Sequence, residues 1–259
     1  MVDAQAATFR PGSWASYGAY LGVGLAILAL VLLAAAPLGW RAGWWHYRFA
    51  FTWLMTYSAY TAIAAAIISV FTLALGWPQL DGRAMTAAGL GIALGAALTY
   101  VPWHYNHMGR TVPRIHDITT DPSDPPRFVA VLPARAAENA NSVNYEGPEV
   151  ARLQRAAYPD VVPLVVALPS SEAFERARNA AATMPGWTIV ASDPSTGRIE
   201  ASQTSLWFGF TDDIVIRVAA QGGGSRIDMR SESRQGRGDF GVNAGRVRAY
   251  MAELRQRVG

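Results

Sequence analysis

Three long stretches without charged residues constrain the fold of this chain more than any other feature. No Asp, Glu, Lys or Arg stands between Arg10 and Arg41, between Arg48 and Asp81, or between Arg83 and Arg110. The hydrocarbon core of a bilayer is about 30 Å thick and needs about 20 apolar residues at the rise of an α-helix. The chain is therefore predicted to cross a membrane three times, with spans near 17–38, 51–75 and 85–103.

The flanks and composition of these stretches favour a helix bundle. A secretory signal peptide is the alternative for the first stretch, but it ends in Pro37-Leu38-Gly39-Trp40 without a clear small-x-small cleavage site. The third stretch is rich in Gly and Ala, and Gly91-x-x-x-Gly95 has the spacing of small residues that is typical of close helix packing. We expect a tight three-helix bundle.

Charge divides the chain into two regions. Residues 1–110 carry five Arg and two acids, a net charge of +3, whereas residues 111–259 carry 17 Arg and 17 acids and are neutral. A nucleic-acid-binding domain needs a basic patch, so no nucleic-acid partner is expected. The absence of cysteine excludes disulfides, thiolate metal ligands and a cysteine nucleophile.

The number of spans fixes which arginines share a membrane side. Arg10 and Arg83 lie on one side, and four arginines lie on the other side with the soluble domain: Arg41, Arg48, Arg110 and Arg114. Taken alone, the positive-inside rule places that domain in the cytoplasm, by a margin of one charge once the N-terminal amine is counted.

The remainder of the chain is predicted to contain a connector and a globular domain. Prolines at 113, 122, 125 and 126 interrupt the connector and favour an extended chain. Residues 129–160 are polar and are expected to be irregular. The chain is thus divided into a transmembrane anchor (1–110), a Pro-rich connector with an irregular segment (111–160) and a globular domain (161–259).

Periodicity places the elements of the globular domain. A strand over Val161–Leu168 precedes a helix that Ser170 or Ser171 caps, and a second helix starts at Asp239. Four further strands are predicted at 187–191, 198–204, 213–219 and 226–233. The fold class is α+β: an antiparallel sheet, covered on one face by two helices, follows the transmembrane bundle.

The last predicted strand alternates charged and apolar residues. Arg226, Asp228, Arg230, Glu232 and Arg234 share one face, and the residues between them share the other. We expect the helices to cover the apolar face and to leave the Arg230 face uncovered. That face is interpreted as a solvated ladder of ion pairs, with an Arg-lined surface for an anionic ligand or another subunit as the alternative.

The connector offers carboxylates to the domain. Asp117 and Asp121 stand on a chain stiffened by proline, and an ordered segment of this kind needs partners for its polar groups. Arg230, Arg234 and Arg246 are the predicted partners. This arrangement makes the connector a rigid mount instead of a flexible stalk.

Several segments resemble one family. They are Ile115–Asp121, Asp124–Phe128, Gly197–Ala201, Phe210–Val218, Arg230–Arg234 and Asp239–Asn243. Together they resemble the domain-of-unknown-function family 1499 (DUF1499), found mostly in bacteria with relatives in plastids, and the three-span anchor is similar to one of its recurrent architectures. The resemblance implies no catalytic residue and no cofactor. Other members look like exported lipoproteins or lumenal domains, so the resemblance favours an extracytoplasmic domain against the arginine count.

Two motifs suggest chemistry that we do not favour. His46, His104, His107 and His116 share one membrane side, but histidine is an ordinary interfacial residue and no metal site is predicted. Gly236-x-Gly238-x-x-Gly241 follows an antiparallel strand, which is the wrong context for a dinucleotide fingerprint.

Two classes of function remain. The favoured one is a non-enzymatic accessory, scaffold or ligand-binding protein of the bacterial inner membrane, with the lipid bilayer as a partner and another membrane protein or complex as an open one. The alternative is a membrane-tethered hydrolase or anion-binding enzyme that uses His116, Asp117 and the Arg-lined face. The candidate surface comprises His116, Asp117, Asp121, Asp212, Arg217, Arg230, Arg234, Asp239, Asn243 and Arg246.

Overall fold

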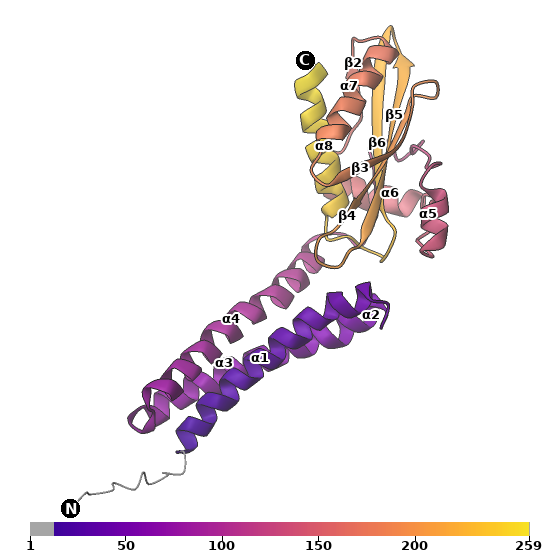
Figure 1. Cartoon of the computed structure of the whole chain (residues 1–259). Coiled ribbons are helices and arrows are strands. Elements are labelled where there is room, and N and C mark those ends of the chain that lie inside the picture. Colours follow the sequence, from indigo (N-terminus) through magenta and orange to yellow (C-terminus); the bar gives the residue numbers. More distant parts are fainter. Residues whose placement is uncertain (1–12, 259) are drawn as a thin grey trace, which may run out of the picture. The chain divides into compact units, whose positions relative to one another are not determined.

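The computed structural model describes residues 13–258 and divides into two compact units, Met1–His107 and Met108–Gly259 (Figure 1). Within the described residues, three helical segments are long and apolar enough to cross a membrane, which confirms the three predicted spans. The helices are α1 (Trp14–Arg41), α2 (Tyr47–Phe49), the π-helical turn η1 (Ala50–Leu54), α3 (Met55–Gly76), the 3-10 turn η2 (Trp77–Gln79) and α4 (Gly82–Thr111). The last turn of α4 belongs to the second unit.

Small residues allow the long helices of the first unit to approach closely. A Cβ atom added to Gly91 of α4 would lie 2.2 Å from Ser69 Oγ of α3 and 3.2 Å from the carbonyl carbon of Gly22 of α1. A Cβ atom at Gly95 would lie 2.7 Å from the carbonyl oxygen of Ala62. The close packing predicted from the Gly91-x-x-x-Gly95 spacing is therefore confirmed.

The second unit contains an antiparallel sheet in the order β1-β6-β5-β4-β3, and β2 also pairs with β6. Its elements are β1 (Asp117–Thr119), α5 (Leu132–Ala137), α6 (Pro148–Ala157), β2 (Leu164–Val166), α7 (Ser170–Thr183), β3 (Trp187–Asp193), β4 (Arg198–Thr204), β5 (Thr211–Gln221), β6 (Gly224–Ser233) and α8 (Val242–Val258). The predicted α+β class and the four-strand meander are confirmed.

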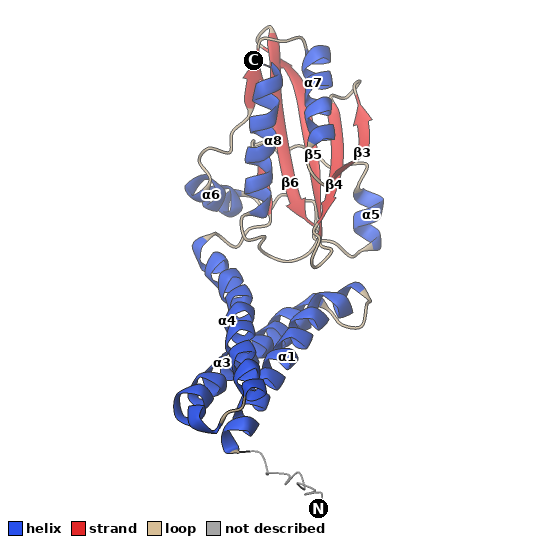
Figure 2. Cartoon of the chain, turned by 60° about the vertical axis from the view of Figure 1, so that its left-hand side comes forward, coloured by secondary structure: helices blue, strands red, loops and turns tan. Residues whose placement is uncertain are grey.

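Helices α7 and α8 cover one face of the sheet, and α5 lies on the other side (Figures 1 and 2). The core lies between the sheet and helices α7 and α8. It buries the alternate apolar residues of the strands, including Ile227 and Met229 of β6, against Phe174 of α7 and Met251 of α8. Burial of one such side chain stabilises a fold by about 1.5 to 3 kcal/mol. The predicted register, with Ile227 and Met229 toward the helices, is confirmed.

The segment 111–160 is more regular than predicted. Strand β1 lies within the connector, and α5 and α6 lie within the stretch that was expected to be irregular, so regular structure begins before residue 161. Helix α6 has local start signals, with proline in its first turn followed by Glu149. Strand β1 has three residues and forms by pairing with β6, which is more than 100 residues away in the chain. Its own residues therefore carry no local signal for a strand.

Three predicted boundaries were wrong. The strand expected over Val161–Leu168 is limited to Leu164–Val166, where the chain meets β6. Helix α7 follows Pro169 and has no side-chain cap, although Ser170 and Ser171 were expected to supply one. Helix α8 begins three residues after Asp239, since Phe240 and Gly241 adopt positive φ angles of 56° and 81°.

Candidate functional site

Residues 126–143, which precede α6, cover the charged face of the sheet. The Glu200 carboxylate on β4 accepts hydrogen bonds from the backbone N–H groups of Val129, Ala130 and Val131 at 3.0 to 3.1 Å. Arg230 on β6 donates to the carbonyl oxygens of Pro126, at 3.4 Å, and Val143, at 2.8 Å. Main-chain groups of residues 126–143 therefore replace solvent over this face.

The first cluster on this face surrounds Arg230. Its guanidinium donates to both carboxylate oxygens of Asp117 at 2.9 and 2.8 Å and lies 3.2 Å from Glu232. Arg135 of α5 joins the cluster, 2.8 Å from Asp213 and 2.7 Å from Glu232. Arg230 is 3% exposed and Glu232 0% exposed. The prediction of a solvated ladder was wrong, because Arg135 of α5 and the main chain of residues 126–143 lie on this face and exclude solvent from it.

Burial perturbs Glu232 in this first cluster and Tyr145 beside it, whose ring centroid lies 5.9 Å from the Arg230 guanidinium. Loss of solvent, followed by the negative charge of Asp117, raises the pKa of Glu232 to about 8 against the opposing effect of Arg135 and Arg230. Burial and then Asp117 raise the pKa of Tyr145 to about 12. The Glu232 carboxyl group consequently favours its protonated form near neutral pH.

The second cluster surrounds Asp228 on β6. The carboxylate of Asp228 accepts from Arg217 at 3.1 Å and from Arg226 at 2.9 Å. Both arginines also reach Asp121 of the connector, at 3.5 and 2.8 Å. Arg217 makes a further ion pair with Asp124 at 2.7 Å. This cluster ties the connector to β5 and β6.

The third cluster joins α8 to the end of β6. Arg246 lies 2.7 Å from Asp212 and donates to Ser231 Oγ at 2.9 Å. Asn243 donates to the main-chain oxygen of His116 at 2.9 Å, and its own N–H donates to Asp239 Oδ2 at 2.6 Å. Asp239 thus caps α8 through its side chain, as predicted, although burial raises its pKa.

The connector is held by the domain, but only partly through the predicted partners. Arg230 binds Asp117 as predicted. Arg234 instead binds Asp213 at 2.8 Å and Glu138 at 2.6 Å, and Asp121 is bound by Arg217 and Arg226. The ten candidate residues are divided among separate clusters, and their role as a ligand or partner surface stays a prediction.

Gln154 and Arg135 are among the residues of this network that were missed in the sequence. Gln154 of α6 accepts from the N–H of Thr119 at 3.0 Å and donates to its carbonyl oxygen at 2.7 Å, so that it extends the sheet beyond β1. Arg135 bridges β5 and β6. Both residues stand on short helices, and no local pattern indicates their distant partners.

The metal and nucleotide motifs occupy unrelated places. In residues 13–258 no group of three His, Asp or Glu side chains is arranged to hold a metal ion. His104 stacks on Tyr100 and His107 on Trp103, with ring centroids 5.6 Å apart in each pair. The glycines at 236, 238 and 241 form the loop between β6 and α8. Interfacial aromatic packing accounts for both histidines.

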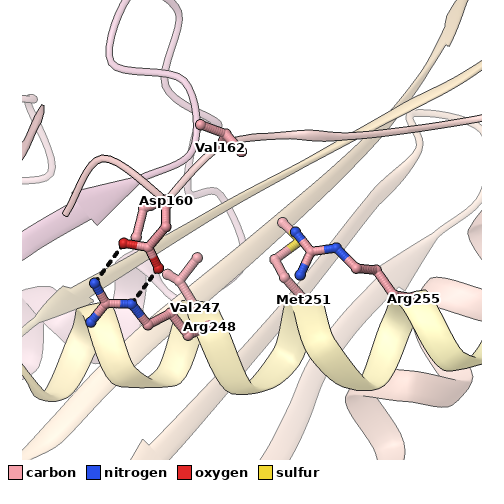
Figure 3. Close-up of a pocket in the computed structure, with 7 residues that line it drawn as sticks. Asp160, Val162, Val247, Arg248, Met251 and Arg255 are labelled. Carbon is pink, nitrogen blue, oxygen red and sulfur yellow. Dashed lines mark hydrogen bonds and ion pairs between the residues drawn. The ribbon is translucent and has the colours of Figure 1, made fainter.

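A cavity of about 290 Å³ lies beside α8, and none of its lining residues belongs to the three clusters (Figure 3). Its lining includes Val162, Val247, Met251 and the ion pair of Asp160 with Arg248, whose atoms lie 2.6 and 2.7 Å apart. This pair holds the pKa of Asp160 below its ordinary value.

The comparisons with known proteins were made against families, curated proteins and solved structures. The model of a family described as "Protein of unknown function (DUF1499)" matches residues 117–254. The chain belongs to the DUF1499 family. Neither a curated protein nor a solved structure matches it. The DUF1499 match begins at β1 and includes α5 and α6. Residues 126–143, which cover the charged face of the sheet, are therefore part of the family's domain.

Proposed function

We propose that this DUF1499 protein is a non-enzymatic accessory or scaffold protein of the bacterial inner membrane. In this proposal the three spans anchor a rigid domain whose partners are the bilayer and another membrane protein or complex. The observation that carries the proposal is the burial of the Arg230 cluster, in which arginine and carboxylate groups bind one another and main-chain groups. Charged groups used in this way stabilise a fold instead of binding a ligand.

The alternative enzyme receives less support from the geometry. His116 contributes its main-chain oxygen to Asn243, and Asp212 is bound by Arg246. A hydrolase needs a base positioned beside a nucleophile or an activated water in a cleft. The cavity beside α8 is lined by apolar side chains, Arg255 and an internally paired Asp160, which supplies no such arrangement.

The functional proposal is tested with the purified full chain carrying His116→Gln or Asp212→Asn. Each variant is isolated from native membranes in mild detergent. If the protein is a scaffold, the amount of membrane partner recovered with either variant is comparable to the amount recovered with the unchanged chain. Glu149→Gln, at an exposed helical ion pair, is the control. An ester, phosphoester or peptide hydrolysis that either variant abolishes while the domain stays folded would instead establish the enzyme.

We also propose that the domain faces the extracytoplasmic side, on the strength of the resemblance to exported members of the family. The chain has no cysteine, so one introduced residue gives a clean accessibility measurement. A membrane-impermeant maleimide is expected to label Gln221→Cys in intact spheroplasts and to leave Gln79→Cys, across one span, unlabelled. Labelling of Gln79→Cys alone would place the domain in the cytoplasm.

A further inference from the structure

The loop between β4 and β5 carries an uncharged, aromatic sequence. Residues 205–210 read Ser-Leu-Trp-Phe-Gly-Phe, and no charged residue stands between Glu200 and Asp212. Leu206, at the tip, is 93% exposed. A single exposed leucine is ordinary in a soluble domain. Here it is followed by Trp207, which is partly exposed, and a leucine beside an indole suits the boundary between water and lipid, whereas the ring of Phe208 is buried.

Hydrogen bonds and ring stacking hold this loop in one shape. Ser205 N–H donates to the Phe210 oxygen at 2.8 Å, Phe210 N–H to Ser205 Oγ at 3.0 Å, and Gly209 N–H to the Ser205 oxygen at 3.0 Å. The rings of Phe208 and Phe210 stack with centroids 5.2 Å apart. A rigid loop presents Leu206 to an apolar phase at little further cost in conformational entropy.

The loop lies at the end of the sheet that receives the chain from α4. Ser233 N–H donates to the His116 oxygen, and Arg234 N–H donates to the Thr211 oxygen, each at 3.0 Å. These bonds bring the start of β1, the end of β6 and the base of the loop together. Figure 2 shows the loop at the end of the sheet where α8 begins.

Chain length keeps this end of the sheet near the bilayer. From Trp103, within the third span, to Thr111 at the end of α4 there are eight residues, about 12 Å of helix. The five residues from Thr111 to His116 span at most about 17 Å. Together these lengths hold the start of β1 within about 29 Å of Trp103. This distance is short enough for the end of the sheet to reach a headgroup layer about 5 to 8 Å thick.

Exposed arginines accompany the apolar loop at this end. Arg110 stands in the last turn of α4, Arg114 three residues beyond its end, and Arg237 in the loop between β6 and α8. Gly238 packs against the backbone of Arg114, where an added Cβ atom would lie 3.3 Å from Arg114 Cα, so Arg237 and Arg114 are neighbours. The acids of this end are neutralised: Asp212 pairs with Arg246, and Asp239 caps α8.

We propose that this end of the domain, formed by Leu206, Trp207, Arg110, Arg114 and Arg237, binds the surface of a bilayer that contains anionic phospholipids. The aromatic loop enters the headgroup layer, and the arginine guanidinium groups bind lipid phosphates. Each basic residue near an anionic surface favours the docked state about fivefold. This surface deepens the accessory function proposed above, on which it rests for the bilayer as a partner, by assigning the class of lipid and the residues that bind it. Its test reads lipid contact and does not depend on the recovery of a protein partner.

The test places a fluorophore on Leu206→Cys in the full chain, which has no other cysteine. The protein is reconstituted into vesicles of phosphatidylcholine alone or with phosphatidylglycerol, each containing a lipid with a nitroxide quencher near its headgroup. Gln221→Cys, at the β5–β6 turn and the opposite end of the sheet, is the matched position. Quenching is expected at 206, increased by phosphatidylglycerol, and absent at 221.

The arginines are tested by the double variant Arg114→Gln/Arg237→Gln in the Leu206→Cys chain. Loss of two charges is expected to lower the ratio of docked to free domain about 30-fold in phosphatidylglycerol vesicles. Arg178→Gln/Arg255→Gln removes two arginines from α7 and α8 and is expected to change nothing. Equal quenching at positions 206 and 221 would overturn the proposal. It would also be overturned if the fluorophore at position 206 were protected from an aqueous quencher but not quenched by the lipid nitroxide, because protein would then cover the loop. Quenching that ignores both phosphatidylglycerol and the arginine variant would overturn the assignment to anionic headgroups.

Discussion

Replacement of Glu232 by glutamine is expected to remove a pH dependence of stability from the second unit. Arg135, Arg230 and Arg234 face four carboxylates, those of Asp117, Glu138, Asp213 and Glu232. Glu138 is half-exposed, so the buried part of this group is three arginines with Asp117, Asp213 and Glu232. Glu232 is fully buried, and loss of solvent, followed by the negative charge of Asp117, raises its pKa to about 8 from an ordinary value of 4.5. The buried carboxyl group therefore holds a proton near neutral pH.

The sign of the effect follows from proton linkage. Between pH 4.5 and 8 the folded state holds a proton on Glu232 that the unfolded state has lost. The free energy of unfolding therefore falls as the pH rises through this range, by about 1.4 kcal/mol per pH unit at most. The loss from this one group between pH 5.5 and 8 is on the order of 3 kcal/mol. Glutamine keeps the shape of the protonated acid and has no proton to lose.

The assay uses a buried cysteine in the full chain. Val218→Cys, in the core beneath α7, reacts with a thiol reagent only when the domain opens, so labelling rates in detergent give an opening free energy. We compare the opening free energy of Glu232→Gln with that of its parent at each pH. Relative to the parent, the opening free energy of the variant is expected to rise by about 3 kcal/mol from pH 5.5 to 8. Glu175→Gln, at an exposed helical ion pair, is the control. A constant difference would refute the reasoning and show that Arg135 and Arg230 keep Glu232 ionised.

Asp117→Asn is expected to cost about 3 kcal/mol in the same assay, because it leaves Arg230 buried without its bidentate partner; a cost near zero would show that the connector is not held by this pair. Asp239→Ala is expected to cost about 0.5 to 2 kcal/mol through loss of the α8 cap, and protection of the α8 amides against hydrogen exchange should fall first. Gly95→Val is expected to lower the temperature at which the detergent-solubilised chain aggregates, since its Cβ atom would lie 2.7 Å from the Ala62 oxygen. Gly89→Val, where an added Cβ atom meets nothing within 4 Å, should leave that temperature unchanged.

Local patterns in the sequence predicted much of this fold. The charge-free stretches predicted three membrane helices, and strict alternation along Arg226–Arg234 predicted which residues of β6 enter the core. These features depend on the period of one element and on the solvent at each of its faces. The residues of the DUF1499 motifs likewise indicated the family correctly.

The candidate site was predicted less well, because its environment comes from distant segments. Glu200, on β4, receives the N–H groups of Val129, Ala130 and Val131, about 70 residues earlier in the chain. Arg135 reaches Asp213 and Glu232 from a six-residue helix with no side-chain cap. A short helix of this kind is not stable alone, so its own residues carry little signal.

The sequence by itself determined the membrane anchor, the α+β class and the division of β6 into an apolar and a charged face, since each follows from the hydrophobic effect acting on a local period. Only the tertiary structure decided whether the charged face meets water or protein. The answer depends on Asp117 and Arg135 crossing to β6, where Arg230 and Glu232 lose solvent and gain ionic partners. Ion pairing of this kind has no sequence period, because it is set by where the connector and α5 lie in space.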